Sequence, residues 1–178
     1  MGKFKAYAIE FAKLANGEHT FEYSVNDAFF AEFPESRIKH GQVECRVTID
    51  KEDDVLQLLF ETEGSVNTTC DRCLNSLAYP IQSEDRLIVT LGSDFEEQDA
   101  DVIVIPGSET ELNVAQYIYE YIHIALPMII NCDGLENVTC DEQILKYINH
   151  TTEEEAPEEP EADPRWNALK ELKSKKDK

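Results

Sequence analysis

Two alternating segments, residues 43–49 and 56–60, constrain the fold more than any other part of the chain. The alternation over residues 43–49 has the period of a strand that buries one face. A polar turn follows at residues 51–54, and a second alternating set over residues 56–60 predicts a partner strand that ends at Gly64. These residues therefore predict an antiparallel β-hairpin with one buried face.

Further strands are predicted from similar patterns along the chain. Residues 87–91 alternate in the same way, and residues 102–105 form a short apolar run after an acidic loop at residues 94–101. The segments 7–11 and 19–25 are expected to add two more strands. Together these segments predict a mainly antiparallel sheet.

One main helix, predicted over residues 113–126, is expected to cover this sheet. Asn113 is a residue type that caps helices, and the apolar side chains after it recur at mostly three- and four-residue spacing. Pro127 should end the helix, because proline lacks an amide donor and disfavours helical geometry in the preceding residue. Shorter helices are expected over residues 27–30, capped by Asp27, and over residues 141–148.

These elements predict an α+β fold for residues 1–150. The sheet is expected to be curved and mainly antiparallel, with closure into a barrel left open. The length of 178 residues suits one compact domain with a short appendage. No apolar run approaches the roughly 20 residues that cross a bilayer, and no secretory-type apolar stretch follows the first residues. We therefore expect a cytoplasmic protein.

The net charge of −21 is unevenly distributed. Residues 151–164 carry seven acidic side chains and no basic one, and residues 165–178 carry six basic and two acidic ones, which leaves −18 for residues 1–150. A body this acidic repels a phosphate backbone and favours basic partners. Broad, non-specific nucleic-acid binding by the body is therefore not expected, and neither DNA nor a membrane is an expected partner.

The two C-terminal segments differ in character. Residues 151–164 are predicted to be a disordered acidic linker, and residues 165–178 a short basic amphipathic helix, with Asp163 and Pro164 at its start. A tryptophan beside basic residues can stack on RNA or anchor in a protein groove, and the helix can equally fold back onto the acidic body. The candidate partner-binding residues are Arg165, Trp166, Leu169, Lys170 and Lys173.

The strongest local signal is the CxxC pair Cys70 and Cys73. Two thiolates at this spacing can bind one tetrahedral metal ion, because the turn between them brings both sulfurs to one point. Cys132 lies 59 residues after Cys73, followed by Cys140. One interpretation is a structural zinc ion held by these four cysteines; the other is a reduced pair in a loop and two incidental thiols. Disulfides are not expected in a reducing compartment.

Signatures of catalysis are absent from the sequence. The seven glycines are never closer than 15 positions, so no glycine-rich phosphate loop can form, and no GxSxG or HExxH motif occurs. His123 is expected to pack within its helix and Cys45 within the core. A thioredoxin-type CxxC opens a helix after a parallel strand, whereas the pattern around Cys70 is antiparallel. We therefore predict no enzymatic activity.

Several short matches occur together in the order found in one known family. They are Gly64-x-Val66, Cys70-Asp71-Arg72-Cys73-Leu74 before Pro80-Ile81, Leu126-Pro127, and Asp163-Pro164-Arg165-Trp166-x-Ala168-Leu169-Lys170-x-Leu172. The combination resembles the YceD-like proteins, described as large ribosomal RNA subunit accumulation proteins. The resemblance implies a non-enzymatic role in making or maintaining the large ribosomal subunit, by contact with ribosomal RNA or a ribosomal protein.

Three functional hypotheses follow. The first is a ribosome-assembly accessory that binds a basic ribosomal protein or assembly factor through the acidic body, and RNA or another factor through the tail. The second is a thiol redox or metal-dependent protein centred on Cys70 and Cys73. The third is an acidic scaffold for other proteins, with an indirect ribosomal link. We favour the first, because the resemblance and the division of charge both agree with it.

Overall fold

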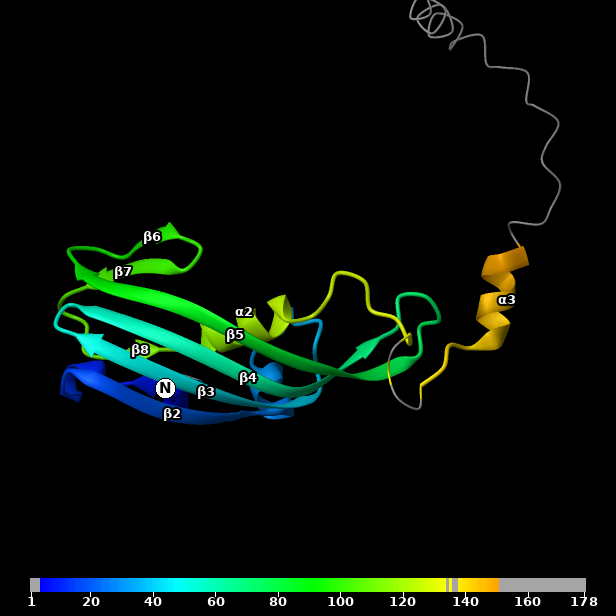
Figure 1. Cartoon of the computed structure of the whole chain (residues 1–178), viewed down its shortest axis with the longest axis horizontal. Helices are drawn as coiled ribbons and strands as arrows, with labels where there is room; N and C mark the ends of the chain where they lie inside the picture. Colours follow the sequence, from blue (N-terminus) through cyan, green and yellow to red (C-terminus); the bar gives the residue numbers. More distant parts are fainter. Residues whose placement is uncertain (1–3, 134, 136–137, 151–178) are drawn as a thin grey trace, which may run out of the picture. The chain divides into compact units, whose positions relative to one another are not determined.

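The computed structural model describes residues 4–133, 135 and 138–150 (Figure 1). The chain divides into two compact units between Cys140 and Asp141, so α3 (Glu142–His150) is described by itself. The predicted linker and tail, residues 151–178, lie outside the described residues.

Six strands form the main sheet, in the order β2-β3-β4-β5-β7-β6. Neighbouring strands run antiparallel except β5 and β7, which are parallel. The fold is therefore α+β with a mixed, mostly antiparallel sheet. The strand bounds are β2 (Gly17–Val25), β3 (Gly41–Glu52), β4 (Val55–Thr69), β5 (Ser76–Gly92), β6 (Glu96–Asp99) and β7 (Val102–Pro106).

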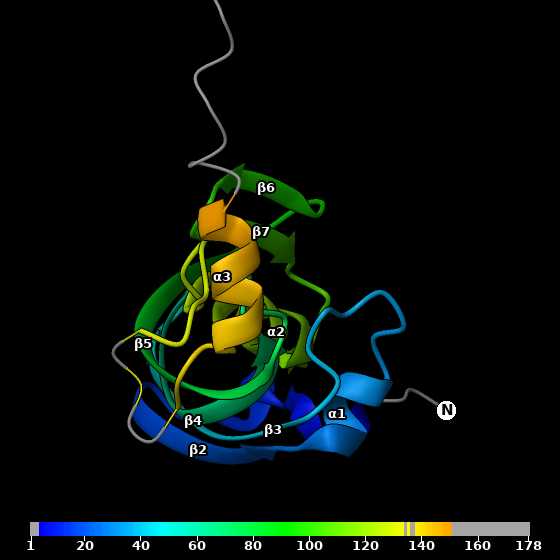
Figure 2. The same ribbon diagram turned by 90° about the vertical axis from the view of Figure 1, so that its right-hand side faces the viewer.

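The sheet is curved but does not close into a barrel. Figure 2 shows it bending around α2 (Ala115–Ile124), which lies on the concave side. The two outermost strands, β2 and β6, do not pair with each other in the part of the chain that the structure describes. The sequence did not decide whether the sheet closes into a barrel; in the structure it stays open, and α2 covers its core side.

The core lies between α2 and the buried face of the sheet. Along β3 the buried and exposed side chains alternate, as the sequence predicted, and Cys45 is one of the buried ones. Ile118 and Ile122 of α2 are fully buried against this face. The hydroxyl of Tyr121 donates to the carbonyl oxygen of Arg86 on β5 at 3.2 Å, which fixes the helix against the sheet.

The ends of the helices differ slightly from the prediction. The N-cap of α2 is Val114, not the predicted Asn113, and the helix stops at Ile124. The side chain of Asn113, one residue before the cap, accepts a hydrogen bond from the amide of Ala115 at 3.0 Å. For α1 (Asp27–Ala31), the cap is Asn26, not the predicted Asp27. The Asp27 carboxylate instead accepts from the amide of Gly41 at 3.0 Å, which ties α1 to the start of β3.

Two predicted segments have a different backbone from the one expected. Of residues 7–11 only β1 (Ala8–Ile9) is a strand, paired with β8 (Leu112–Asn113) and flanked by the 3₁₀ turns η1 (Lys5–Tyr7) and η2 (Phe11–Lys13). The predicted acidic loop at residues 94–101 contains β6, whose four side chains are all exposed. Because β6 has no buried apolar side chain, the alternation of apolar and polar residues could not reveal it.

The helix α3 begins directly after Asp141. The Asp141 carboxylate accepts from the amide of Gln143 at 2.8 Å and so caps the helix. The sequence predicted this helix over residues 141–148, and it extends to His150. Among the residues described, no helix is long and apolar enough to cross a membrane.

Gly64 does not end its strand, contrary to the prediction. It lies inside β4, opposite Val43 on β3 and Ile81 on β5. A Cβ atom at this position would lie 2.3 Å from the backbone oxygen of Gln42 and 2.6 Å from the Cα of Val43. Glycine is therefore needed here for the close approach of two backbones, a role that glycine also takes within strands.

Replacing Gly64 by Ala is expected to lower the free energy of unfolding by about 1–3 kcal/mol, because the new methyl group forces β3 and β4 apart. Chemical denaturation followed by circular dichroism measures the change. The control is Gly107→Ala, where the nearest atom to the added Cβ, the Gly92 oxygen, is at an ordinary 3.7 Å. Equal stability of the two variants would contradict this account of β4.

Candidate metal centre

The long β4–β5 hairpin carries the CxxC pair at its tip. Backbone pairing on the β3 side reaches only to Asn67, whose amide donates to the carbonyl oxygen of His40 at 2.8 Å. Beyond that point Thr68 and Thr69 pair with β5 alone. A two-stranded ribbon is marginally stable in water, so the tip requires further contacts to stay ordered.

A tight turn brings Cys70 and Cys73 together. The Leu74 amide donates to the carbonyl oxygen of Cys70 at 2.9 Å, and the Cys70 amide donates to that of Asn75 at 2.9 Å. Leu74 has a φ of 62°, in the left-handed region that non-glycine residues rarely adopt. The amide of Cys73 donates to the Cys70 sulfur at 3.4 Å. Both thiols are buried by this turn and its surroundings.

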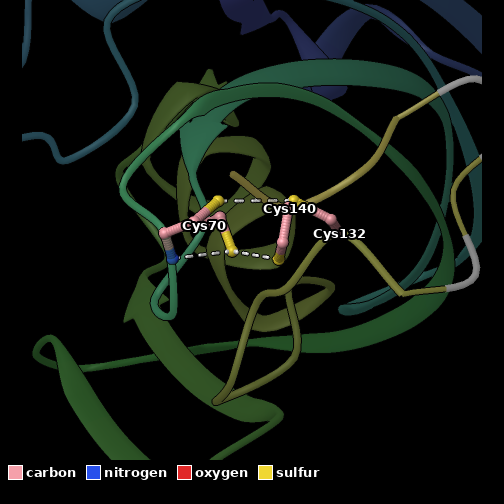
Figure 3. A group of neighbouring side chains, drawn as sticks. Cys70, Cys132 and Cys140 are labelled. Carbon is pink, nitrogen blue, oxygen red and sulfur yellow. Dashed lines mark hydrogen bonds between the residues drawn. The ribbon is translucent and has the colours of Figure 1, made fainter. Parts of the chain in front are cut away.

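The structure brings the four predicted cysteines into one cluster. Their Sγ atoms all lie within 4.8 Å of one another, with Cys70–Cys140 at 3.9 Å and Cys73–Cys132 at 3.6 Å. Figure 3 shows the side chains of Cys70, Cys132 and Cys140 pointing toward one another. Four sulfurs bound tetrahedrally at about 2.3 Å from zinc are about 3.8 Å apart, whereas a disulfide requires about 2.05 Å. The spacing therefore fits one metal ion.

Asp71, inside the CxxC motif, joins the turn that carries Cys70 and Cys73 to the segment that carries Cys132. Its amide donates to the carbonyl oxygen of Ile130 at 2.7 Å, and its carboxylate accepts from the Ile130 amide at 2.7 Å. These two bonds place the chain after α2 beside the turn. Cys132, two residues further on, is thereby held close to Cys73.

Arg72, the other residue inside the motif, compensates negative charge at the cluster. Its Nε donates to the Cys140 sulfur at 3.3 Å, and its guanidinium pairs with the Asp133 carboxylate at 2.6 Å. These two hydrogen bonds raise the pKa of Arg72 further above its high ordinary value. Such donors around a metal site orient its ligands and adjust their charge.

The surroundings shift the pKa values of two of the thiols in opposite directions. Burial raises the pKa of Cys70, but amide donors from Cys73 and Arg72 outweigh burial and lower it to about 6. Burial, followed by the neighbouring thiols, raises the pKa of Cys132. At neutral pH Cys70 is therefore ready as a thiolate, whereas Cys132 must release a proton when a metal binds. Metal affinity is consequently expected to rise with pH.

Metal sites made of four cysteine sulfurs stabilise structure and do not bind a substrate. Four protein ligands complete a tetrahedron around zinc and leave no open position for a substrate or water. The zinc would join the hairpin tip to the segment that follows α2. A thioredoxin-type redox site places its CxxC at the start of a helix, and the turn of Cys70 and Cys73 instead joins two antiparallel strands.

Other residues singled out in the sequence lie elsewhere. Cys45 is in the core of β3, where burial and the charge of Asp85 raise its pKa to about 12. His123 is half-buried on α2 and bonds to the carbonyl oxygen of Tyr119 at 2.7 Å. The candidate partner-binding residues Arg165, Trp166, Leu169, Lys170 and Lys173 lie outside the described residues.

The fold and the site define a small α+β protein with a candidate four-cysteine metal centre. The profile of the family described as large ribosomal RNA subunit accumulation protein YceD matches residues 58–173. The match covers most of the chain and all four cysteines, so the chain belongs to the YceD family. The family's name links it to large-subunit ribosomal RNA and names no reaction. No curated protein and no solved structure gives a significant match.

Purified protein is expected to contain one zinc ion per chain, measured by elemental mass spectrometry. Cys132→Ser should lose the metal, because a tetrahedral site loses a thiolate ligand. Cys45→Ala should keep it, because Cys45 is not among the clustered cysteines. Equal zinc content in the two variants, or a wild-type protein that takes up no zinc under reducing conditions, would contradict the assignment.

Proposed function

We propose that this protein acts without catalysis in the accumulation of large-subunit ribosomal RNA, as a cytoplasmic factor that binds ribosomal components. Family membership supports the ribosomal link. The observation that carries the binding role is the negative charge of the sheet face turned away from α2. Zinc at the four cysteines would have a structural part, because a closed four-thiolate site offers no position for a substrate.

The exposed face of the sheet carries carboxylates in register across four strands. One cross-strand row contains Glu22, Arg46, Glu61 and Glu84, and the next contains Ser24, Glu44, Glu63 and Gln82. Arg46 lies 3.6 Å from Glu22 and 3.9 Å from Glu61, in exposed pairs that contribute little to stability. Most of these side chains line one open hollow.

This charge favours a basic protein over a nucleic acid as the partner of the sheet. Residues 1–140 contain 26 acidic side chains against 9 lysines and arginines. Such a surface repels phosphate and attracts the lysine- and arginine-rich segments typical of proteins that bind RNA. We assign a basic ribosomal protein or assembly factor to the body. Contact with ribosomal RNA is assigned to the basic C-terminal residues 165–178.

Depletion of the protein from its own cells should lower the ratio of large- to small-subunit ribosomal RNA, measured by electrophoresis of total RNA and by gradient sedimentation. The reason is that a factor required for accumulation limits one subunit and not the other. Expression of the wild type or of Cys45→Ala should restore the ratio. Cys132→Ser should not restore it, because the hairpin tip loses its metal.

Immunoblotting provides the control that all variants are present at equal levels. A normal ratio after complete depletion would overturn the proposed function. A lowered ratio in cells where the tagged protein never co-sediments with large-subunit precursors would indicate an indirect link, as expected for a scaffold that serves other proteins.

A further inference from the structure

The segment that joins α2 to the metal centre exposes large apolar side chains. Met128 is fully exposed at 101% and Ile129 is 72% exposed, and Ile124 at the end of α2 is 71% exposed. Leu74, at the end of the CxxC turn, is 74% exposed. We call Ile124, Met128 and Ile129 the arch surface, after the arch that residues 125–130 form in Figure 1.

The arch is fixed at both ends. At one end the amide of Ala125 donates to the carbonyl oxygen of Tyr121 at 2.9 Å, which continues α2. At the other end Ile130 is held by its two hydrogen bonds to Asp71. Met128 and Ile129 are exposed between these two anchored points.

Exposed large apolar side chains are rare elsewhere in residues 4–140, as far as the structure describes them. Within this described range, five large apolar side chains are exposed, and three of them, Ile124, Met128 and Ile129, lie within six consecutive residues. The other two are Leu74, at the CxxC turn, and Phe95, at 60% beside the edge strand β6. Isolated exposed apolar residues are ordinary, whereas several within one short segment indicate a surface for interaction.

Charge decides which kind of partner fits. Residues 1–140 carry a net charge of −17, from 26 acidic and 9 basic side chains. A second copy of the chain would bring the same negative charge, and RNA would bring phosphates, so both are repelled. Aliphatic side chains also lack the aromatic faces on which bases stack. A protein segment with apolar residues flanked by lysine or arginine meets both requirements.

We propose that the arch surface is the docking site for a basic protein segment that places apolar side chains against Met128 and Ile129. Its lysines and arginines face the acidic body. This inference rests on the proposed function, because it specifies the chemistry of the protein partner assigned there. Methionine suits the role, since its flexible side chain adapts to the shape of a partner.

The test is photo-crosslinking in cells that express the full chain with p-benzoylphenylalanine at position 128, and as a control with the same amino acid at position 95. The crosslinked peptides are sequenced by mass spectrometry. The expected result is one predominant protein, joined to position 128 through a segment rich in lysine or arginine with apolar residues at the crosslink. Adducts to RNA, to a second copy, to the same chain, or no adduct would overturn the inference.

The identified partner is then purified and titrated with variants of the full, metal-loaded chain. The double variant Met128→Ser/Ile129→Ser should weaken binding by more than about tenfold, as loss of an apolar anchor does. The matched control Phe95→Ser should change it by less than about twofold. Unchanged affinity of the double variant at unchanged zinc content would overturn the docking site.

The same cells separate this inference from the proposed function. If depletion lowers the large-subunit ribosomal RNA and the double variant restores it fully, the proposed function stands and the docking site is wrong. If depletion leaves the RNA ratio normal, the proposed function is wrong, and a confirmed crosslink then describes a partner outside ribosome assembly.

Discussion

The cluster of four sulfurs at the end of the β4–β5 hairpin is the constraint on which the functional part of the molecule depends. The hairpin extends past its neighbouring strand, and a two-stranded ribbon in water has too little buried surface to hold its own end. Cys132 and Cys140 come from the chain after α2 and meet the tip within metal-binding distance. Asp71 and Arg72, placed between the first two cysteines, add hydrogen bonds across the same junction.

The junction and the sheet present two different surfaces. The exposed face of the sheet is dominated by carboxylates, and its pairs around Arg46 leave most of that charge uncompensated. Beside the junction, the chain that leads from α2 exposes Met128 and Ile129. Long-range attraction by charge and short-range burial of apolar area are complementary in protein recognition, since the first accelerates encounter and the second stabilises the complex.

The periodicity of apolar residues predicted the elements that bury one face, such as β3 and α2. The alternation in β3 and the apolar stripe of α2 identified the core, because burial of one face determines both patterns. Gly64 was misread as a strand end, since a close approach to another strand is invisible in a single segment. The four-cysteine site was one of two interpretations of the sequence. The long separation of Cys73 and Cys132 prevented a choice between them, because their proximity depends on the tertiary fold. Asp71 was overlooked as a contact, although its place inside the motif was a usable signal.

Hydrogen exchange of the backbone amides, with and without metal, tests most directly whether the metal centre holds the hairpin tip to the chain after α2. After removal of the metal by a chelator under reducing conditions, the amides of Asp71 and Ile130 should exchange more than about tenfold faster, because their mutual hydrogen bonds open locally. Amides in the middle of β3, such as Val47, should keep their protection. Equal protection of Asp71 and Ile130 in the two states would contradict the account.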